Sequence, residues 1–125
     1  MKRELGIARC GLACCLCAKN ANCNGCHAEN CLDKDWCENR KCALEKSVSH
    51  CFVCDNTDCR KGLLGKVKPL AFTEFARKYG IEHLLDCLER NEAKGIVYHR
   101  TGIVGDYDDF ESMEQLMEFI ETGER

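Results

Sequence analysis

The sequence predicts a mainly α-helical protein with irregular, metal-stapled loops. Twelve of the thirteen cysteines fall between Cys10 and Cys59, at spacings typical of metal ligands. Residues 69–125, in contrast, repeat apolar side chains with a helical period. The chain has 125 residues, the size of one compact domain. We therefore expect one unit in two parts, a cysteine-rich metal-binding part at 1–68 and a helical part at 69–125 packed on it.

The cysteine-rich part repeats one ligand pattern. A C-x-x-C-x-x-x-x-C segment begins at Cys23 and again at Cys51, and Cys14 and Cys17 form a further C-x-x-C pair. Two intervening residues make a tight turn that brings both sulfurs to one tetrahedral ion. The pattern predicts zinc knuckle-like loops, joined by one short helix at 38–47.

The expected metal has a structural role. Between Cys10 and Cys59 only eight of fifty residues are large and apolar, too few to close a core. A structural zinc site supplies roughly 10–16 kcal/mol of binding energy that is also folding energy. We expect two to three zinc ions per chain, with an iron–sulfur cluster as the alternative because thiolates bind both. The expected ligands are Cys10, Cys14, Cys17, Cys23, Cys26, Cys31, Cys37, Cys42, Cys51, Cys54 and Cys59.

Two histidines and two cysteines are not assigned as ligands by the repeated cysteine pattern. His27 and His50 flank expected ligands, and either could complete a third site, although each is also an ordinary surface residue. Cys15 interrupts the first motif, and Cys87 lies among the apolar residues of a predicted helix, where a cysteine behaves as a small hydrophobe. We expect neither of these two cysteines to be a ligand.

About three helices are predicted in the helical part. The first starts at Pro69 and stops at Gly80, the second starts at Ile81 and ends near Gly95, and the last ends near Gly123. Asp108-x-x-Glu111 has the form of a capping box that opens the last helix. The apolar stripes of the three helices are Phe72, Phe75, Ala76 and Tyr79, then Ile81, Leu84, Leu85 and Leu88, then Met113, Leu116, Met117 and Ile120.

Several motifs together carry a family resemblance. They are CGLACCLC at 10–17, CNGC at 23–26, the C-x-x-x-x-C-A-x-E-K segment from Cys37, and the C-x-x-C-x-x-x-x-C loop at 51–59. In these motifs the chain resembles the short cysteine-rich proteins of bacteria and archaea that form a domain family of unknown function. The resemblance spans roughly residues 8–62, and Cys15 departs from it. It implies zinc-binding cysteines in a prokaryotic protein and assigns no reaction.

Composition and charge narrow the functional classes. The apolar stretch after MKRE is too short for a signal peptide, and no later segment has the length and hydropathy of a membrane span, so we expect a cytoplasmic protein with no membrane partner. A reducing cytoplasm favours metal thiolates over disulfides. The formal net charge is −3, and bound thiolates would make it more negative, so we do not expect a nucleic-acid partner.

The expected function is that of a structural zinc-binding protein of unknown process, an interaction or regulatory module with a protein partner. The alternative is a small iron–sulfur or thiol-based redox protein. The sequence carries no recognisable catalytic motif, so the balance is against an enzyme. The remaining catalytic candidates are Tyr98-His99-Arg100 with Asp106, Asp108 and Asp109, which a capping or surface role explains equally well.

Overall fold

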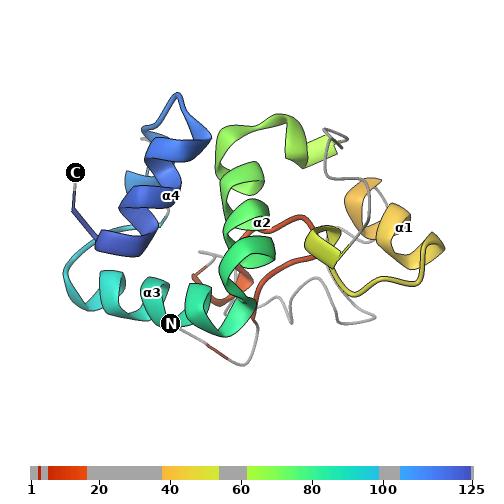
Figure 1. Ribbon diagram of the computed structural model, residues 1–125, viewed down its shortest axis with the longest axis horizontal. Helices are drawn as coiled ribbons and strands as arrows, with labels where there is room; N and C mark the ends of the chain where they lie inside the picture. The colour runs from red at the N-terminus through yellow and green to blue at the C-terminus, as the bar shows by residue number, and fades with distance from the viewer. Residues whose placement is uncertain (1–2, 4–5, 17–37, 54–61, 99–104, 125) are drawn as a thin grey trace.

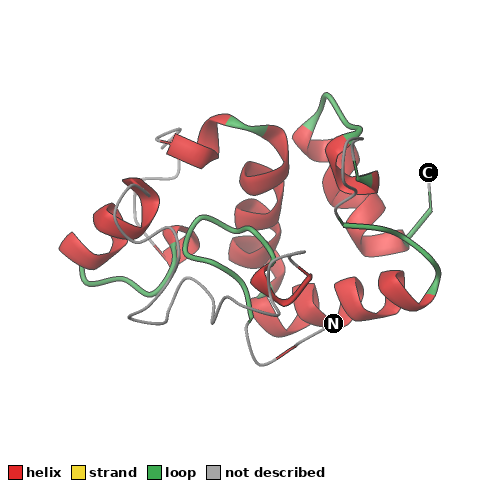
Figure 2. Ribbon diagram, turned by 180° about the vertical axis from the view of Figure 1, so that it is seen from behind, coloured by secondary structure: helices red, strands yellow, loops and turns green. Residues whose placement is uncertain are grey.

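A computed structural model describes residues 3, 6–16, 38–53, 62–98 and 105–124. This part of the chain is mainly helical and contains no strand (Figure 2). Its four α-helices are α1 at Glu38–Glu45, α2 at Val67–Tyr79, α3 at Ile81–Ala93 and α4 at Met113–Thr122. Helix α2 stands between α1 and α4, which lie at opposite ends of the molecule, and α3 crosses the base of α2 (Figure 1). None of the helices in the described ranges is long and apolar enough to cross a bilayer.

Helix α2 begins two residues before the predicted start. Pro69 is the third helical residue, where its missing N–H costs nothing because the first backbone donors of a helix have no intrahelical partner. Phe72, Phe75 and Ala76 are buried, as the apolar stripe predicts. Tyr79 was placed on the same stripe but is 49% exposed, so the buried face ends one turn earlier.

Helix α3 follows α2 with only Gly80 between them. Gly80 donates its N–H to the Ala76 carbonyl at 2.9 Å, and its own carbonyl accepts from the Leu84 N–H at 3.2 Å. The predicted stripe is buried at Leu84, Leu85 and Leu88, whereas Ile81 is half-buried. The helix ends at Ala93, two residues before Gly95 adopts a φ of 92°.

Helix α4 begins later than the sequence indicates. Ser112 is its N-cap, with Oγ accepting from the Gln115 N–H at 3.4 Å. Asp108 is the last residue of a separate 3-10 turn, and its Oδ2 accepts from the Gly105 N–H at 3.2 Å. The predicted capping box at Asp108 and Glu111 is therefore wrong as the start of this helix. Leu116 and Ile120 are buried as predicted, Met113 and Met117 are half-buried, and Gly123 ends the helix in the left-handed region.

Helix α1 is shorter than the predicted range of 38–47. It ends at Glu45, and Ser47 adopts a left-handed φ of 57° that stops the helix from continuing. Ala43 is buried, but Leu44 is 49% exposed. The helix therefore buries little apolar surface of its own.

The main core lies between α2, α3 and α4 and also takes in the segment before α1. Phe72, Leu84 and Leu116 are each 0% exposed within it. Ile7, Ala13 and Cys15 belong to the same buried cluster, although they precede the helices by more than fifty residues. The Tyr98 hydroxyl accepts a hydrogen bond from the Ala13 N–H at 3.0 Å inside this core. Ile7, Ala13 and Cys15 are thus built into the helical packing.

Candidate metal sites

The first ligand motif is a compact turn. Ala8 donates its N–H to the Leu12 carbonyl at 2.7 Å, and Gly11 donates to the Ala8 carbonyl at 3.0 Å. A 3-10 turn follows at Cys14–Leu16. Cys10 and Cys14 then pack together with Ala8 and Leu12 in a small cluster that is separate from the main core. The turn brings the first two expected ligands into one environment.

This turn is held tightly on α2. The Thr73 hydroxyl donates to the Cys10 carbonyl at 2.9 Å in a buried hydrogen bond. Gly11 has a φ of +96°, and a Cβ at this position would lie 2.4 Å from Thr73 Oγ1 and 2.7 Å from the Pro69 carbonyl oxygen. Only glycine satisfies both the backbone conformation and the close approach. The glycine of the CGL motif therefore sets the distance between the ligand turn and α2.

Cys15 faces away from its neighbour Cys14. It is 0% exposed in the main core, and burial raises the pKa of its thiol to about 11. The thiol is protonated at neutral pH, whereas a metal ligand is a thiolate. Its position gives Cys15 a packing role, in line with its place outside the repeated pattern.

Cys51 lies beside the first motif. Its N–H donates to the Arg9 carbonyl at 2.7 Å, and the Arg9 guanidinium donates to the Ser49 carbonyl at 3.1 Å. From α2, Arg77 donates to the Cys51 carbonyl at 3.2 Å and to the Phe52 carbonyl at 3.1 Å. The backbone before Cys10 and the start of the second ligand loop therefore run next to each other, and α2 supports both.

The Cys51 sulfur also has a donor aimed at it. Asn39 Nδ2 lies 3.9 Å from Cys51 Sγ, and the Asn39 side chain is only 2% exposed. Gly62 makes room for this amide, because a Cβ at Gly62 would lie 2.6 Å from Asn39 Oδ1. Hydrogen bonds from N–H groups favour the charged form of a sulfur over the neutral one. The environment of Cys51 is thus suited to a thiolate.

Of the remaining expected ligands, only Cys42 lies within the described residues. Cys42 lies on α1 with a half-buried free thiol. No three of the expected ligands within the described ranges come together as one group. Seven expected ligands and one candidate histidine lie outside the described residues: Cys17, Cys23, Cys26, Cys31, Cys37, Cys54, Cys59 and His27.

His50, the other candidate histidine, is engaged by the protein. Its Nε2 lies 2.9 Å from the Ile7 carbonyl and its Nδ1 lies 3.1 Å from the Ser49 hydroxyl. A carbonyl only accepts, so Nε2 carries a proton and donates it to the Ile7 carbonyl. The ring also stacks on Phe52 with centroids 4.9 Å apart. These contacts favour a structural role for His50 over metal ligation.

The candidate acid–base residues near Tyr98 also have local roles. Asp106 Oδ2 accepts from the Val97 N–H at 2.7 Å, and the Asp106 N–H donates to the Val97 carbonyl at 2.8 Å. Asp108 forms an ion pair with Lys68 at 2.7 Å, in addition to its bond to Gly105. His99 and Arg100 lie outside the described residues. The two aspartates are accounted for by the fold.

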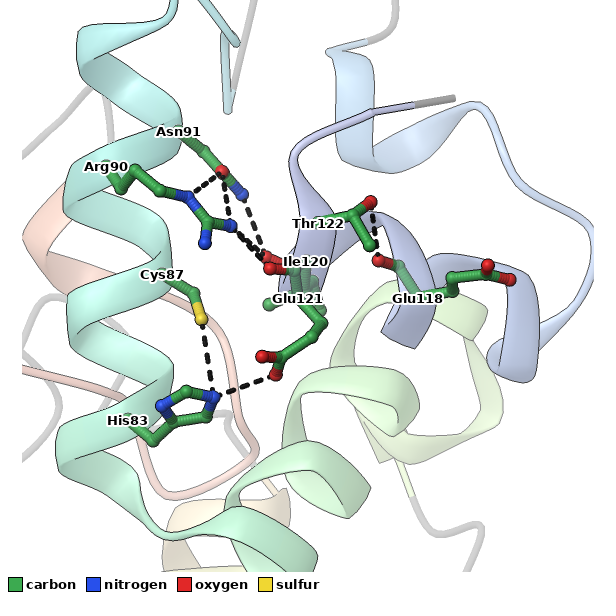
Figure 3. A network of polar contacts seen from close by, with 8 residues as sticks. All are labelled: His83, Cys87, Arg90, Asn91, Glu118, Ile120, Glu121 and Thr122. Carbon is green, nitrogen blue, oxygen red and sulfur yellow. Dashed lines mark hydrogen bonds and ion pairs between the residues drawn. The ribbon is translucent and has the colours of Figure 1, made fainter.

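A second group of metal-binding side chains lies between α3 and α4. His83 Nε2 is 2.8 Å from Glu121 Oε2 and 3.7 Å from Cys87 Sγ (Figure 3). Cys87 is 3% exposed, and burial followed by the nearby Glu121 carboxylate raises the pKa of its thiol. The three side chains were not connected by sequence reasoning. The i, i+4 spacing of His83 and Cys87 was a signal that they share a helix face, but nothing in the sequence brings Glu121 to it.

In comparisons with protein-family models, with curated proteins and with solved structures, no match was found for this chain. The resemblance to the cysteine-rich family therefore rests on the motifs in the sequence.

Proposed function

We propose that this chain is a structural zinc-binding protein that acts as an interaction or regulatory module. The main support is that Cys10 and Cys14 lie together in a small cluster outside the main core, on a turn that is hydrogen-bonded to α2. These two cysteines share one zinc ion, and the loops that follow hold one or two more. Thiolate-saturated zinc is closed to water, which suits a structural role.

The contrast between adjacent cysteines supports this proposal. Cys14 and Cys15 differ by one position, yet Cys14 packs with Cys10 and Cys15 is buried in the main core. The thiol outside the main core is thus the one that belongs to the repeated ligand pattern. The amide directed at the Cys51 sulfur adds a second ligand environment suited to a thiolate.

Zinc is favoured over an iron–sulfur cluster because the C-x-x-C pairs fit closed tetrahedral sites. A small iron–sulfur or thiol-based redox protein is the second candidate, and the concentration of cysteines between Cys10 and Cys59 is the observation that favours it. As an interaction module, the protein would act in the cytoplasm on a protein partner, with neither nucleic acid nor a membrane as its target.

Elemental analysis of protein purified without added metal tests the proposal. We expect a colourless protein with two to three zinc ions per chain. Cys10→Ser should lower the zinc content, whereas Cys15→Ser, the matched control at a neighbouring and equally buried cysteine, should leave it unchanged. A brown protein with stoichiometric iron, or equal zinc content in both variants, would contradict the proposal.

A further inference from the structure

We propose that His83, Cys87 and Glu121 form a separate binding site for a zinc-class transition-metal ion, with one coordination position left open. The ligand atoms of these three side chains all lie within 4.8 Å of one another. His83 and Cys87 come from one face of α3, and Glu121 comes from the last turn of α4 (Figure 3). This site is independent of the cysteines assigned to structural zinc above.

The distances fit an ion after a small adjustment. Zinc lies about 2.0–2.1 Å from a histidine nitrogen, about 2.3 Å from a thiolate and about 2.0–2.2 Å from a carboxylate oxygen, so tetrahedral ligands are roughly 3.3–3.6 Å apart. The observed separations are 3.7 Å from Cys87 to His83 and 2.8 Å from His83 to Glu121. The Cys87 and Glu121 ligand atoms lie within 4.8 Å of each other, so a shift of about one ångström or less at the half-exposed Glu121 side chain would bring the three atoms to these separations.

Both contacts meet at the same nitrogen, and this distinguishes a metal site from a catalytic relay. In a Cys–His–carboxylate relay, one ring nitrogen takes the thiol proton and the other is oriented by the carboxylate. Here Cys87 Sγ and Glu121 Oε2 both approach Nε2 of His83. The three potential ligand atoms are thus grouped at one end of the His83 ring, within 4.8 Å of one another, which fits a shared ion better than a relay through both ring nitrogens.

Neighbouring side chains hold the donors in place. The His83 ring stacks on Phe75 at a centroid distance of 5.7 Å and an interplanar angle of 7°. Two turns beyond His83 on α3, Arg90 donates to the Glu121 carbonyl at 2.7 Å and to the Ile120 carbonyl at 3.0 Å. Asn91 donates to the same Ile120 carbonyl at 3.1 Å. These bonds fix the end of α4 against α3, so Glu121 is positioned before an ion arrives.

The donor types and the exposure define the ligand. One nitrogen, one sulfur and one oxygen suit zinc, cobalt or nickel and exclude magnesium and calcium, which prefer oxygen alone. The His83 and Glu121 side chains are 43% and 46% exposed, so the ion reaches the site from solvent. Three protein ligands with a fourth position open to water is the pattern of exchangeable or catalytic zinc. Cys87 thus gains a role beyond the packing expected from sequence.

Cobalt binding to the full chain tests this site, because cobalt bound to a thiolate has a strong charge-transfer absorption. The protein is first saturated with zinc, and only the weakly held metal is then removed. The resulting protein is titrated with Co²⁺, and elemental analysis counts the bound metal. We expect His83→Gln and Cys87→Ser to bind one ion fewer than the unmodified chain, and Glu121→Gln to bind Co²⁺ at least about 10-fold more weakly. Glu118→Gln is the matched control, since Glu118 is exposed on α4 and points away from the site (Figure 3).

The outcomes separate this site from the structural zinc. Loss of one ion in His83→Gln with the same far-UV circular dichroism as the unmodified chain supports the site, whatever the cysteine-rich part binds. Equal metal content and equal cobalt spectra in the unmodified chain, His83→Gln and Glu121→Gln would overturn it. Because the His83 and Glu121 side chains are both half-exposed, these two variants test the site without a cavity in the core.

Discussion

The helical region and the cysteine-rich region are stabilised by different kinds of contact. Helices α2, α3 and α4 bury Phe72, Leu88 and Ile120 completely against one another. Of the described cysteine-rich segments, Ile7, Ala13 and Cys15 enter this same core. The turn at Cys10 and the start of the loop at Cys51 are instead attached to α2 through hydrogen bonds from Thr73 and Arg77 to backbone carbonyls. Such hydrogen bonds fix the orientation of the segments, but each contributes only about 0.5–1.5 kcal/mol to the free energy of unfolding. The difference indicates that apolar packing holds the helices together, whereas the ligand-bearing turn and loop outside the main core depend on bound metal.

Metal removal should have the largest effect, and its result could contradict the proposed difference between the two regions. A strong chelator should disorder residues 10–62 while most helix in 69–125 survives. Helix α1 supplies 8 helical residues, whereas α2, α3 and α4 supply 13, 13 and 10, so most of the helical signal should remain. Far-UV circular dichroism with limited proteolysis would locate the change. Loss of all helix in one step, with cleavage throughout the chain, would show that the two regions form a single cooperative unit.

A core substitution should come next in size. Phe72→Ala should lower the free energy of unfolding by about 3–5 kcal/mol, since Phe72 is 0% exposed and packs edge-on against Tyr107. Leu44→Ala on α1 is the control, with an expected cost below about 1 kcal/mol because Leu44 is 49% exposed. Urea unfolding of the metal-loaded protein measures both. Similar costs for the two variants would contradict the assignment of the core to α2–α4.

Two glycines, one in each region, sharpen the comparison. Gly11 and Gly95 have φ values of +96° and +92°, but only Gly11 would place a Cβ against other atoms. Gly95→Ala should cost about 1–2 kcal/mol from backbone strain alone. Gly11→Ala should cost about 1–3 kcal/mol more from the clash with Thr73 and Pro69, and should also lower zinc content. Equal unfolding energies and equal zinc content in the two variants would show that the close approach of the turn to α2 does not matter.

The last prediction concerns the pKa of Tyr107. Burial raises this pKa to about 12, although the hydrogen bond from Asn91 opposes the shift. Because the folded pKa lies above the ordinary value of about 10, this group's contribution is complete below about pH 10 and is lost as pH rises towards 12. The loss should reach about 2–3 kcal/mol.

Spectrophotometric titration and alkaline unfolding measure this effect. Tyr107→Phe should reduce the alkaline decline and leave the part that comes from the buried Cys15 thiol, whereas Tyr79→Phe, at a tyrosine that is 49% exposed, should leave the decline unchanged. If the helical region holds itself together, the raised pKa of Tyr107 should persist after chelation. An ordinary tyrosine pKa in the chelated protein would mean that the helical core opens when metal is lost.

The helices were predictable because their apolar stripes have a clear period and glycines mark their ends. The start of α4 was predicted one turn too early because Asp108 and Glu111 have the spacing of a capping box. In the fold, Asp108 is bound by Gly105 and Lys68, which leaves Ser112 to cap the helix. Local sequence cannot show that a capping residue is already in use elsewhere.

The candidate sites show a similar limit. The cysteine spacing was enough to name Cys10 and Cys14 as expected ligands, but it did not show which cysteines lie together, and the structure places these two in one small cluster. Nothing in the sequence could show that Cys15 enters the main core or that Glu121 meets His83, because both depend on how distant helices cross. Contacts within one turn follow from the sequence, and contacts between helices do not.

The single residue between α2 and α3 has a consequence for the order of assembly. Gly80 has a φ of 92° and a ψ of 153°, a conformation essentially limited to glycine, and it leaves no loop to be closed between the two helices. The entropy lost in closing this corner is therefore small. By contrast, the bonds from Thr73 to Cys10 and from Ala13 to Tyr98 join residues 63 and 85 positions apart. We expect the α2–α3 corner to form early in folding and to provide the surface on which the ligand turn then settles.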